Sequence, residues 1–275
     1  LYERVLGPEH PQTASAHHNL GSILKVRQKL DAAEGELERA KALLEKAYDH
    51  PQREVAFVHY SLGRLYNVQG RLEEAEASFR RALDLMKQLY GPKSGTTGRV
   101  LESLGDVMYD LQRYDEAASY QRQSLELMIP VFGPDHLFVG GATLNLARSL
   151  HKLGRLDEAE PRLRDALEIY ETALGPEHPD LMILLPTLGE VLHQKGEHER
   201  AISVFERGLA LSKKVEAAAS SRARVYVGLA RALAAGGGDR ARARQLAQQA
   251  RSIYVELGPD AAANLRDVDA WLAGL

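Results

Sequence analysis

Histidine is the residue type in this 275-residue chain that most readily suggests metal or acid–base chemistry, because imidazole binds transition metals and titrates near neutral pH. The chain has ten histidines, and the most suggestive are His17, His18, His151 and His193. None of them belongs to a His-Glu-x-x-His motif or to another histidine and carboxylate set at ligand spacing. The sequence therefore predicts no metal site and no cofactor.

Other catalytic motifs are incomplete, because the residues beside them are not the types that the chemistry needs. The run Gly236 to Gly238 is rich in glycine, but Asp239-Arg240 follows where a phosphate-binding loop needs Lys-Ser or Lys-Thr. No serine stands in a nucleophile elbow, and the absence of cysteine excludes thiolate nucleophiles and zinc ribbons. We therefore predict that the chain is not an enzyme.

Composition narrows the class of protein further. The formal charge is −3, from 35 basic and 38 acidic side chains, so no global field draws the chain to nucleic acid or to an anionic membrane. Aromatic residues make up only 6% of the chain, and Ala, Leu, Glu and Arg are abundant, which favours helices over strands. No apolar run approaches the roughly 20 residues that span a bilayer. We expect an all-α protein located in the cytoplasm.

A fixed period organises the whole chain. The hexapeptide LGPEHP begins at residue 6 and again at residue 174, which is 168 residues later and four times 42. A leucine recurs at this spacing, shortened by one residue in the last interval, at Leu20, Leu62, Leu104, Leu146, Leu188 and Leu229. An alanine column follows it, at Ala33, Ala75, Ala117, Ala159, Ala201 and Ala243. A period of this length indicates a repeat architecture.

Each repeat is predicted to be a helical hairpin. One column marks the turn between the two helices of a hairpin, at Gln28, Gly70, Gln112, Gly154, Gly196 and Gly238. The junction glycines Gly7, Gly91, Gly133 and Gly175 should end each second helix, because glycine adopts the left-handed closing conformation and the following proline cannot continue a helix. Pro11 and Pro179 suit the first turn of the next helix.

The predicted limits divide the chain into six hairpins and two end pieces. The chain starts in what resembles the last turns of a helix already under way, residues 1–7, so we expect a fragment of a longer protein. The hairpins are predicted at 12–49, 52–91, 95–133, 136–175, 179–216 and 219–257. A capping helix is predicted at 260–274, with Leu265, Val268, Trp271 and Leu272 on one face. Two irregularities are expected: helix continuing through 215–220, and a kink or a late helix start near Pro186, which has no amide hydrogen.

The repeat resembles a known family. Leu62-Gly63-x-x-Tyr66 followed by Ala75-x-x-x-Phe79 matches the tetratricopeptide signature, whose usual unit has 34 residues. The longer unit with an LGPEHP junction is similar to the tetratricopeptide repeats of kinesin light chains and their bacterial relatives. The resemblance implies an α-solenoid, a right-handed superhelix in which the first helices line a concave groove that holds peptides. The Ala- and Arg-rich composition favours a bacterial source.

The resemblance also implies which residues bind a partner. In related proteins an asparagine just before the leucine column holds the backbone of an extended peptide, and here only Asn19 and Asn145 match it. Ser15, His18 and Phe57 fall at neighbouring lining positions. The predicted groove residues are Tyr60, Arg64, Asn67, Glu102, Asp106, Tyr109, Asp110, Asn145, Arg148, His151, Lys152, Glu190 and His193.

The charges of the groove suggest what kind of segment binds there. One position alternates in sign between hairpins, through Arg64, Asp106, Arg148, Glu190 and Arg231, so the arginines are expected to reach the acids beside them. We predict an extended partner segment of mixed charge. Its acidic part should lie near Arg148 and Lys152, and its basic part near Glu102, Asp106 and Asp110.

Two functions fit this sequence. The first is a non-catalytic scaffold or adaptor that holds a segment of a partner protein, with no nucleic acid and no membrane as partner. The second is a regulatory or sensor region of a larger signalling enzyme, such as a kinase, an NTPase or a caspase-like protease, that contacts its own catalytic domain or an activator. Nothing within the sequence separates the two.

Overall fold

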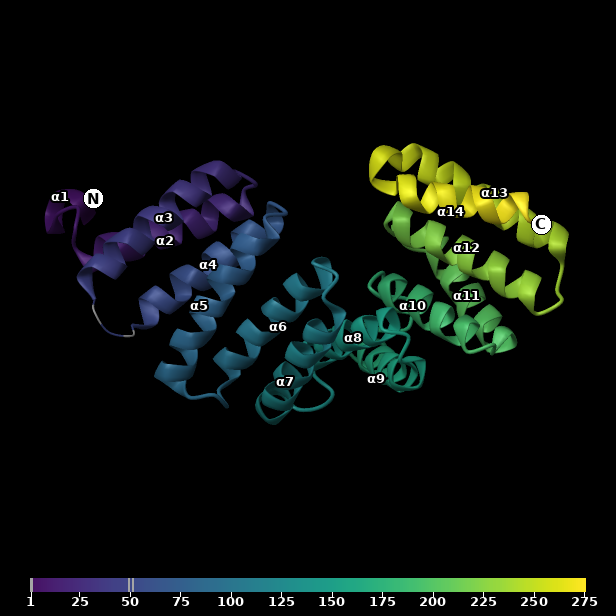
Figure 1. The fold of residues 1–275 in the computed structure, drawn as a ribbon, viewed down its shortest axis with the longest axis horizontal. Coiled ribbons are helices and arrows are strands. Elements are labelled where there is room, and N and C mark those ends of the chain that lie inside the picture. Colours follow the sequence, from purple (N-terminus) through teal and green to yellow (C-terminus); the bar gives the residue numbers. More distant parts are fainter. Residues whose placement is uncertain (1, 49, 51) are drawn as a thin grey trace. The chain divides into compact units, whose positions relative to one another are not determined.

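The computed structural model describes residues 2–48, 50 and 52–275. Leu1, Asp49 and Pro51 lie outside the described residues, so the first residue of the predicted leading helix and the last residue of the first predicted repeat are not placed. The described part of the chain contains helices and turns and no strand, which confirms the all-α solenoid of helical hairpins (Figure 1). Within it, no helix is both long enough and apolar enough to cross a membrane.

The chain forms two compact units that meet in sequence at Gly133 and Pro134. In both units, the two helices of a hairpin pack against each other, and within a unit each second helix packs against the next first helix. Unit 1 consists of α1 (Tyr2–Leu6), α2 (Pro11–Val26), α3 (Leu30–Ala47), α4 (Arg53–Val68), α5 (Leu72–Tyr90), α6 (Gly95–Asp110) and α7 (Tyr114–Phe132). Unit 2 consists of α8 (Leu137–Lys152), α9 (Leu156–Leu174), α10 (Leu181–Gln194), α11 (His198–Ser212), α12 (Ala219–Ala235), α13 (Arg240–Leu257), the 3-10 turn η1 (Gly258–Ala261) and α14 (Ala262–Ala273).

The turns inside the hairpins use the left-handed conformation that the sequence predicted. The φ angle is positive at Gly70, Gly154 and Gly196. It is also positive at Gln28 (58°) and Gln112 (61°), although this conformation is uncommon for residues other than glycine. In the sixth hairpin the prediction of Gly238 is wrong by one residue, because Gly237 has the positive φ of 73°. The shortened last interval of the period moves the turn by one position.

The junctions between hairpins follow the prediction with one exception. Gly7, Gly91, Gly133 and Gly175 all have positive φ and end their helices. Pro11 is the first residue of α2. Pro179, however, precedes α10, which begins only at Leu181. At the start of this helix the Met182 amide donates to the Pro179 carbonyl at 2.9 Å. The helix that contains Pro186 thus starts late, which is one of the two alternatives predicted for it.

The expected continuation of helix through 215–220 does not occur. Helix α11 ends at Ser212, whose hydroxyl donates to the Leu209 carbonyl at 2.8 Å. The Lys214 amide then closes a tight turn on the Leu211 carbonyl at 2.8 Å, and helix resumes at Ala219. The side chain of Ser212 competes for a carbonyl near the end of the helix, and the turn that follows redirects the chain.

The helices approach closely because small residues face large ones. The alanine column is fully buried at all six positions. Phe79 lies against Gly63, where an added Cβ would stand 2.7 Å from the ring. Phe205 is enclosed on two sides, because added Cβ atoms at Gly189 and Gly228 would stand 2.6 Å and 2.2 Å from its ring. Gly228 therefore makes room for a side chain of the preceding helix.

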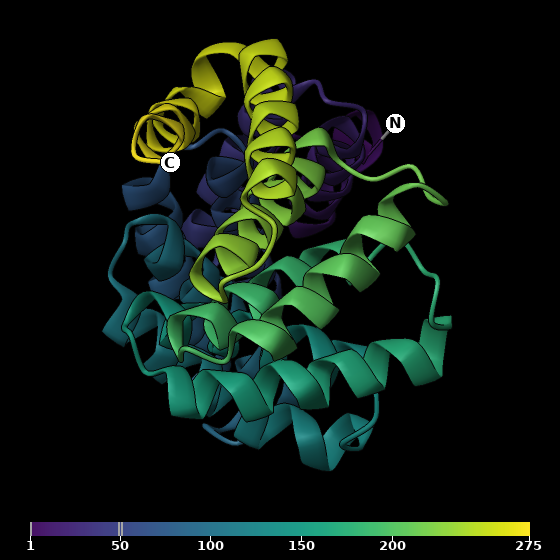
Figure 2. The ribbon, with the colours of Figure 1, turned by 90° about the vertical axis from the view of Figure 1, so that its right-hand side faces the viewer.

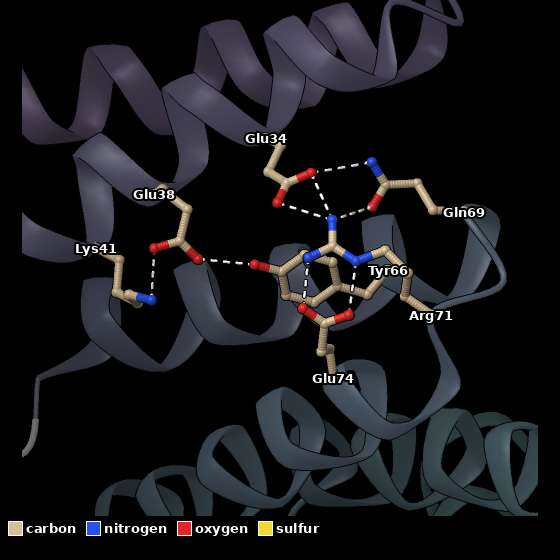
Figure 3. Close-up of polar contacts among 7 residues, drawn as sticks. All are labelled: Glu34, Glu38, Lys41, Tyr66, Gln69, Arg71 and Glu74. Atoms are coloured by element: carbon tan, nitrogen blue, oxygen red, sulfur yellow. Dashed lines mark hydrogen bonds and ion pairs between the residues drawn. The ribbon is translucent and has the colours of Figure 1, made fainter.

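Arginine side chains join the second and third hairpins of unit 1 to the hairpin before them. Arg71, just after the turn glycine, donates to Glu34 of the preceding hairpin at 2.7 Å and also binds Glu74 in its own helix (Figure 3). Arg113 repeats this arrangement with Glu76 at 2.7 Å. In unit 2 the equivalent acid, Glu160, accepts from Lys195 at 2.7 Å. These ion pairs, whose acids are partly or largely buried, fix how one hairpin sits on the next.

Helix α14 lies within the range predicted for a capping helix. Both views draw it beside α13, at the yellow end of the chain (Figure 1, Figure 2). Val268 is buried, and Leu265, Trp271 and Leu272 are partly buried. Asp269 accepts from Arg251 of α13 at 2.6 Å. The apolar side of α14 therefore packs against the last hairpin.

Enlarging Gly228 should destabilise unit 2. Gly228→Ala places a methyl group inside the space of the Phe205 ring, and overpacking of this kind costs about 1–3 kcal/mol. Adding Phe205→Leu should restore part of the loss, as measured by thermal unfolding followed by circular dichroism. Gly35→Ala is the matched control, because Gly35 is an exposed helical position with no atom within 4 Å of an added Cβ. The control should gain up to about 1 kcal/mol, whereas an unchanged melting temperature for Gly228→Ala would refute the packing account.

Candidate functional site

All predicted groove residues lie on first helices, on a surface that we call the first-helix face. None of them is fully buried, although their neighbours Leu62, Leu104 and Leu188 are. Helix α4 carries Tyr60, Arg64 and Asn67, α6 carries Glu102, Asp106, Tyr109 and Asp110, α8 carries Asn145, Arg148, His151 and Lys152, and α10 carries Glu190 and His193. Because the two units are described separately, each has its own first-helix face.

Polar contacts connect successive first helices across the face of unit 1. The Nε2 atom of His18 on α2 lies 2.8 Å from Oγ of Ser61 on α4. One repeat later, the hydroxyl of Ser103 on α6 donates to the hydroxyl of Tyr60 at 3.4 Å. The guanidinium of Arg99 stands 5.9 Å from the centre of the Tyr60 ring. These contacts keep the helices in register while leaving the side chains partly accessible.

The contact between His18 and Ser61 is also a candidate for a catalytic serine–histidine pair. A serine and a histidine at this distance form the first pair of a nucleophilic site, which further needs a carboxylate or amide to orient the imidazole. Burial lowers the pKa of His18, so the ring is neutral at pH 7. Among the described residues no group binds its second ring nitrogen. The pair therefore serves as a bridge between two helices.

A pocket of about 280 Å³ opens between α2 and α4. Leu44 and Val58 form its buried floor. The remaining lining residues are Ser15, His18, Asn19, Arg53, Glu54 and Phe57. The sequence indicated Ser15, His18, Asn19 and Phe57 as lining residues, but it missed Arg53 and Glu54, which precede the leucine column by more than two helical turns. The approach of two helices, which creates the pocket, has no signal in a single repeat.

The charges of unit 1 divide along its first helices. Burial lowers the pKa of Lys25 on α2, and the neighbouring positive charge of Arg64 on α4 lowers it further. Arg64 is exposed and makes no ion pair with any residue that the structure describes, so the expectation that it neutralises an adjacent acid is wrong. Its positive charge instead acts on another cation, Lys25, and this end of the face is basic.

Helix α6 carries the acidic end of the same face. Burial raises the pKa of the Glu102 carboxyl, and the positive charge of Arg99 only partly opposes this effect. Within the described ranges Glu102 has no hydrogen bond and no ion pair. Asp106 and Asp110 follow it at one and two helical turns. A partly buried carboxyl without a partner is costly for the free protein and suits a positively charged ligand.

The face of unit 2 is largely neutralised from within. Arg224 on α12 donates two hydrogen bonds to Glu190, at 3.0 and 2.7 Å, and a third to Thr187 at 3.2 Å. Arg231 instead binds Asp267 of the capping helix at 2.8 Å. The prediction that Arg231 pairs with Glu190 is therefore wrong. Arg224, which lies about two turns earlier on α12, binds Glu190 instead, and α14 supplies Asp267 as the partner of Arg231.

The two predicted histidines of unit 2 are neutral at pH 7. Burial lowers the pKa of His151, and Lys152 and Arg224 lower it further against the opposing charge of Glu190. Burial also lowers the pKa of His193, whose Nδ1 lies 3.2 Å from Nδ1 of His198. No set of three or more metal-ligating side chains occurs in the described part of the chain.

Comparison with known proteins identifies the repeats. The pattern of the tetratricopeptide repeat matches residues 54–129, 100–171 and 138–214. No curated protein matches the chain in sequence.

Solved structures share the fold at low sequence identity. The structure of BtubC (BKLC) from P. vanneervenii is 19% identical, with a TM-score of 0.64 over 90% of this chain and 91% of that one. A putative kinesin light chain from Podosopora anserina, with nearly identical TPR-like repeats, is 22% identical, with a TM-score of 0.62 over 77% of this chain and all of that one. YrrB, a TPR protein described as having an unusual peptide-binding site, is 21% identical, with a TM-score of 0.52 over 72% and 91%. Together with the matched repeats, these likenesses place the chain in the tetratricopeptide repeat family.

Proposed function

We propose that this chain is a non-catalytic scaffold or adaptor of the kinesin-light-chain-like type that holds an extended segment of a partner protein on its first-helix faces. The repeat family and the peptide-binding site named for YrrB support a role in protein interaction. A segment of mixed charge suits the faces best. We further propose a bacterial, cytoplasmic protein that acts in signalling.

Glu102 is the observation that carries this proposal. It is partly buried on α6, has a raised pKa, and has neither a hydrogen bond nor an ion pair in the described structure. A lysine or arginine of a bound segment would supply the missing partner. Because Asp106 and Asp110 extend the same stripe, the basic part of the segment would lie along α6.

Unit 2 favours the acidic part of a segment. Arg224 and Arg231 already neutralise Glu190 and Asp267, so these two acids do not repel an acidic ligand. Lys152, at the exposed end of α8, forms no ion pair with any described residue. It stands one turn beyond Arg148, and the two cations together would attract carboxylates.

Reversing the basic end of α8 should weaken binding. The Arg148→Glu, Lys152→Glu double variant places two acids where the segment is proposed to be acidic, so affinity should fall tenfold or more, on the order of 1.4 kcal/mol. Peptides selected from a random display library can be titrated against parent and variant by fluorescence anisotropy, at two salt concentrations.

Arg122 and Arg162 provide the controls. Both are exposed on second helices, α7 and α9, and neither forms an ion pair among the described residues, unlike Arg80 and Arg164, which bind Glu76 and Glu160. Their reversal to glutamate should leave affinity unchanged. Equal losses for both sets would show that the partner binds elsewhere. Selective capture of a catalytic domain of the full-length protein would favour the regulatory function instead.

Replacing Glu102 by glutamine should stabilise the free protein at neutral pH. Because the folded pKa is raised, the native state binds more protons than the unfolded chain above the ordinary pKa of about 4.3, so stability falls as pH rises through the raised pKa. Glu102→Gln removes this penalty and should raise the melting temperature by a few degrees at pH 7. The difference from the parent should vanish below about pH 4.

Glu126→Gln is the control for this measurement, because Glu126 is exposed on α7. It should leave the melting temperature and its pH dependence unchanged. A destabilised Glu102→Gln protein at pH 7 would mean that the carboxylate has a favourable partner, and the proposed ligand chemistry of α6 would then be wrong. If Glu102→Gln is stabilised but also binds selected peptides as tightly as the parent, the carboxyl is not part of the binding face.

A further inference from the structure

The junction motif LGPEHP contains a histidine that the proposed function does not use. This histidine belongs to a column of five residues, spaced by 42, that stand just before the first helices. We call them the cap column, and they are His10, Gln52, Ser94, His136 and His178. The column therefore places a histidine before three helices, α2, α8 and α10.

Each of the three histidines accepts a hydrogen bond from a backbone amide through its Nδ1 atom. The donor stands two residues after the histidine in every case. The amides are those of Gln12, Phe138 and Asp180, at 3.1, 3.1 and 3.3 Å. Amides at the start of a helix have no carbonyl acceptor within the helix, so the imidazole supplies an acceptor that the backbone lacks.

This use of the ring requires it to be neutral. An imidazole nitrogen accepts a hydrogen bond only while it carries no proton, so the proton of the neutral ring must be on Nε2. Protonation of Nδ1 turns the acceptor into a donor and adds a positive charge at the positive end of the helix dipole. Histidine is the side chain type that titrates between about pH 5 and 8. Mild acid therefore acts on this kind of cap.

The start of α6 uses the same column without a titrating group. The hydroxyl oxygen of Ser94 accepts from the Thr97 amide at 3.2 Å. A hydroxyl keeps its lone pairs at any pH near neutrality, so this cap is insensitive to mild acid. The molecule thus contains a built-in comparison for the three histidine caps.

A second hydrogen bond supports only some of the junctions. The Thr13 hydroxyl donates to the Gly7 carbonyl at 2.9 Å, and the Thr97 hydroxyl donates to the Gly91 carbonyl at 3.0 Å. At the same register, the junctions before α8 and α10 have residues without a hydroxyl, Val139 and Leu181. The starts of α8 and α10 therefore depend more on their histidine than the start of α2 does.

Acids stand beside the first two histidines in sequence. Glu9 precedes His10, and its carboxylate is bound by Lys46 of α3. Asp135 precedes His136. Neither acid provides a new acceptor for the backbone amide when the ring is protonated, because the amide has bonded to the ring itself.

His178 has an acid close to the nitrogen that accepts. Oδ2 of Asp180 lies 3.7 Å from its Nδ1. The other charged groups nearby are paired, since Glu177 binds Lys214, and Arg207 binds Glu171. A protonated His178 can therefore donate to the Asp180 carboxylate, which holds the ring but leaves the Asp180 amide without its acceptor.

We propose that the histidines of the cap column make the starts of α2, α8 and α10 sensitive to acid, while the start of α6 is not. The change is an exchange of partners, in which a proton from solvent occupies Nδ1 and the backbone amide is left to water. The inference concerns the junctions alone, so it does not depend on the proposed function.

Replacing the three caps by asparagine tests the proposal in the whole chain, because asparagine caps helices well and does not titrate. His10→Asn, His136→Asn and His178→Asn together should leave the melting temperature at pH 7.5 nearly unchanged. At pH 5.5 the triple variant should melt above the parent, by about 2 °C or more for each cap that the parent loses. Thermal unfolding followed by circular dichroism measures both.

Two single variants are the controls for this measurement. Ser94→Asn exchanges one non-titrating cap for another. His50→Asn removes a junction histidine that lies outside the cap column and contacts the side chain of Gln52 at 2.6 Å. Each control should follow the parent at both pH values. Parallel melting curves for the parent and the triple variant would overturn the proposal, and so would a gain at pH 5.5 from His50→Asn as large as that from the triple variant.

Nuclear magnetic resonance locates the effect. At pH 7.5 the nitrogen shifts of the three rings should show the tautomer with its proton on Nε2. At pH 5.5 the amides of Gln12, Phe138 and Asp180 should lose protection against hydrogen exchange several-fold, after correction for the intrinsic rate, whereas the Thr97 amide should keep it. A proton on Nδ1 at pH 7.5, or an equal loss at Thr97, would contradict the inference.

Discussion

The packing of a large side chain against a glycine or alanine on the neighbouring helix is the contact on which this fold depends. Phe79 against Gly63 sets the distance within the second hairpin, and Phe205 lies between Gly189 and Gly228 of two successive first helices. Each contact removes a large apolar side chain from water, yet none closes a core on its own. Stability therefore arises from neighbouring hairpins together, as in other repeat proteins.

This way of stacking leaves one side of every first helix free for polar residues. From Leu62 onward the leucine column is buried in the stack. The residue before each leucine, which is Asn19, Ser61, Ser103, Asn145 or Thr187, is at least partly accessible except for the buried Thr187. The hydroxyl of Thr187 instead accepts a hydrogen bond from Arg224. Gly228, at the same position of the last hairpin, has no side chain and so leaves space for the Phe205 ring. Along unit 2 this position thus changes from a partly accessible polar side chain at Asn145 to internal support at Thr187 and Gly228.

The sequence predicted the fold well because the fold is repetitive. A glycine or glutamine at each turn, a Gly-Pro junction and two columns of small residues occur at a fixed spacing, so each hairpin supports the interpretation of the others. The errors fall at Gly238, at Pro179 and after Ser212. There, a local hydrogen bond or a shortened interval decides the chain path, and no other repeat reports on it.

The candidate site was less predictable, because it depends on contacts between hairpins rather than on positions within one. The predicted residues do lie on first helices, but Arg231 binds Asp267 and Arg224 binds Glu190, pairings that require α12 and α14 to be placed in space. The pocket between α2 and α4, and the lack of an ion pair at Glu102 among the described residues, also depend on contacts between hairpins. Long arginine side chains choose among several acids within reach, so register alone does not determine their partners.

The contacts of α14 combine the two kinds of interaction that join the other helices of the stack. Helix α14 covers the last hairpin with an apolar side that includes Val268, and it presents Asp267 and Asp269 to Arg231 and Arg251. These acids therefore bind arginines of the last hairpin, just as Glu34 and Glu76 bind Arg71 and Arg113 in unit 1. Apolar packing and ion pairs thus recur together from one helix of the stack to the next, because the apolar contact sets the distance and the ion pair sets the register.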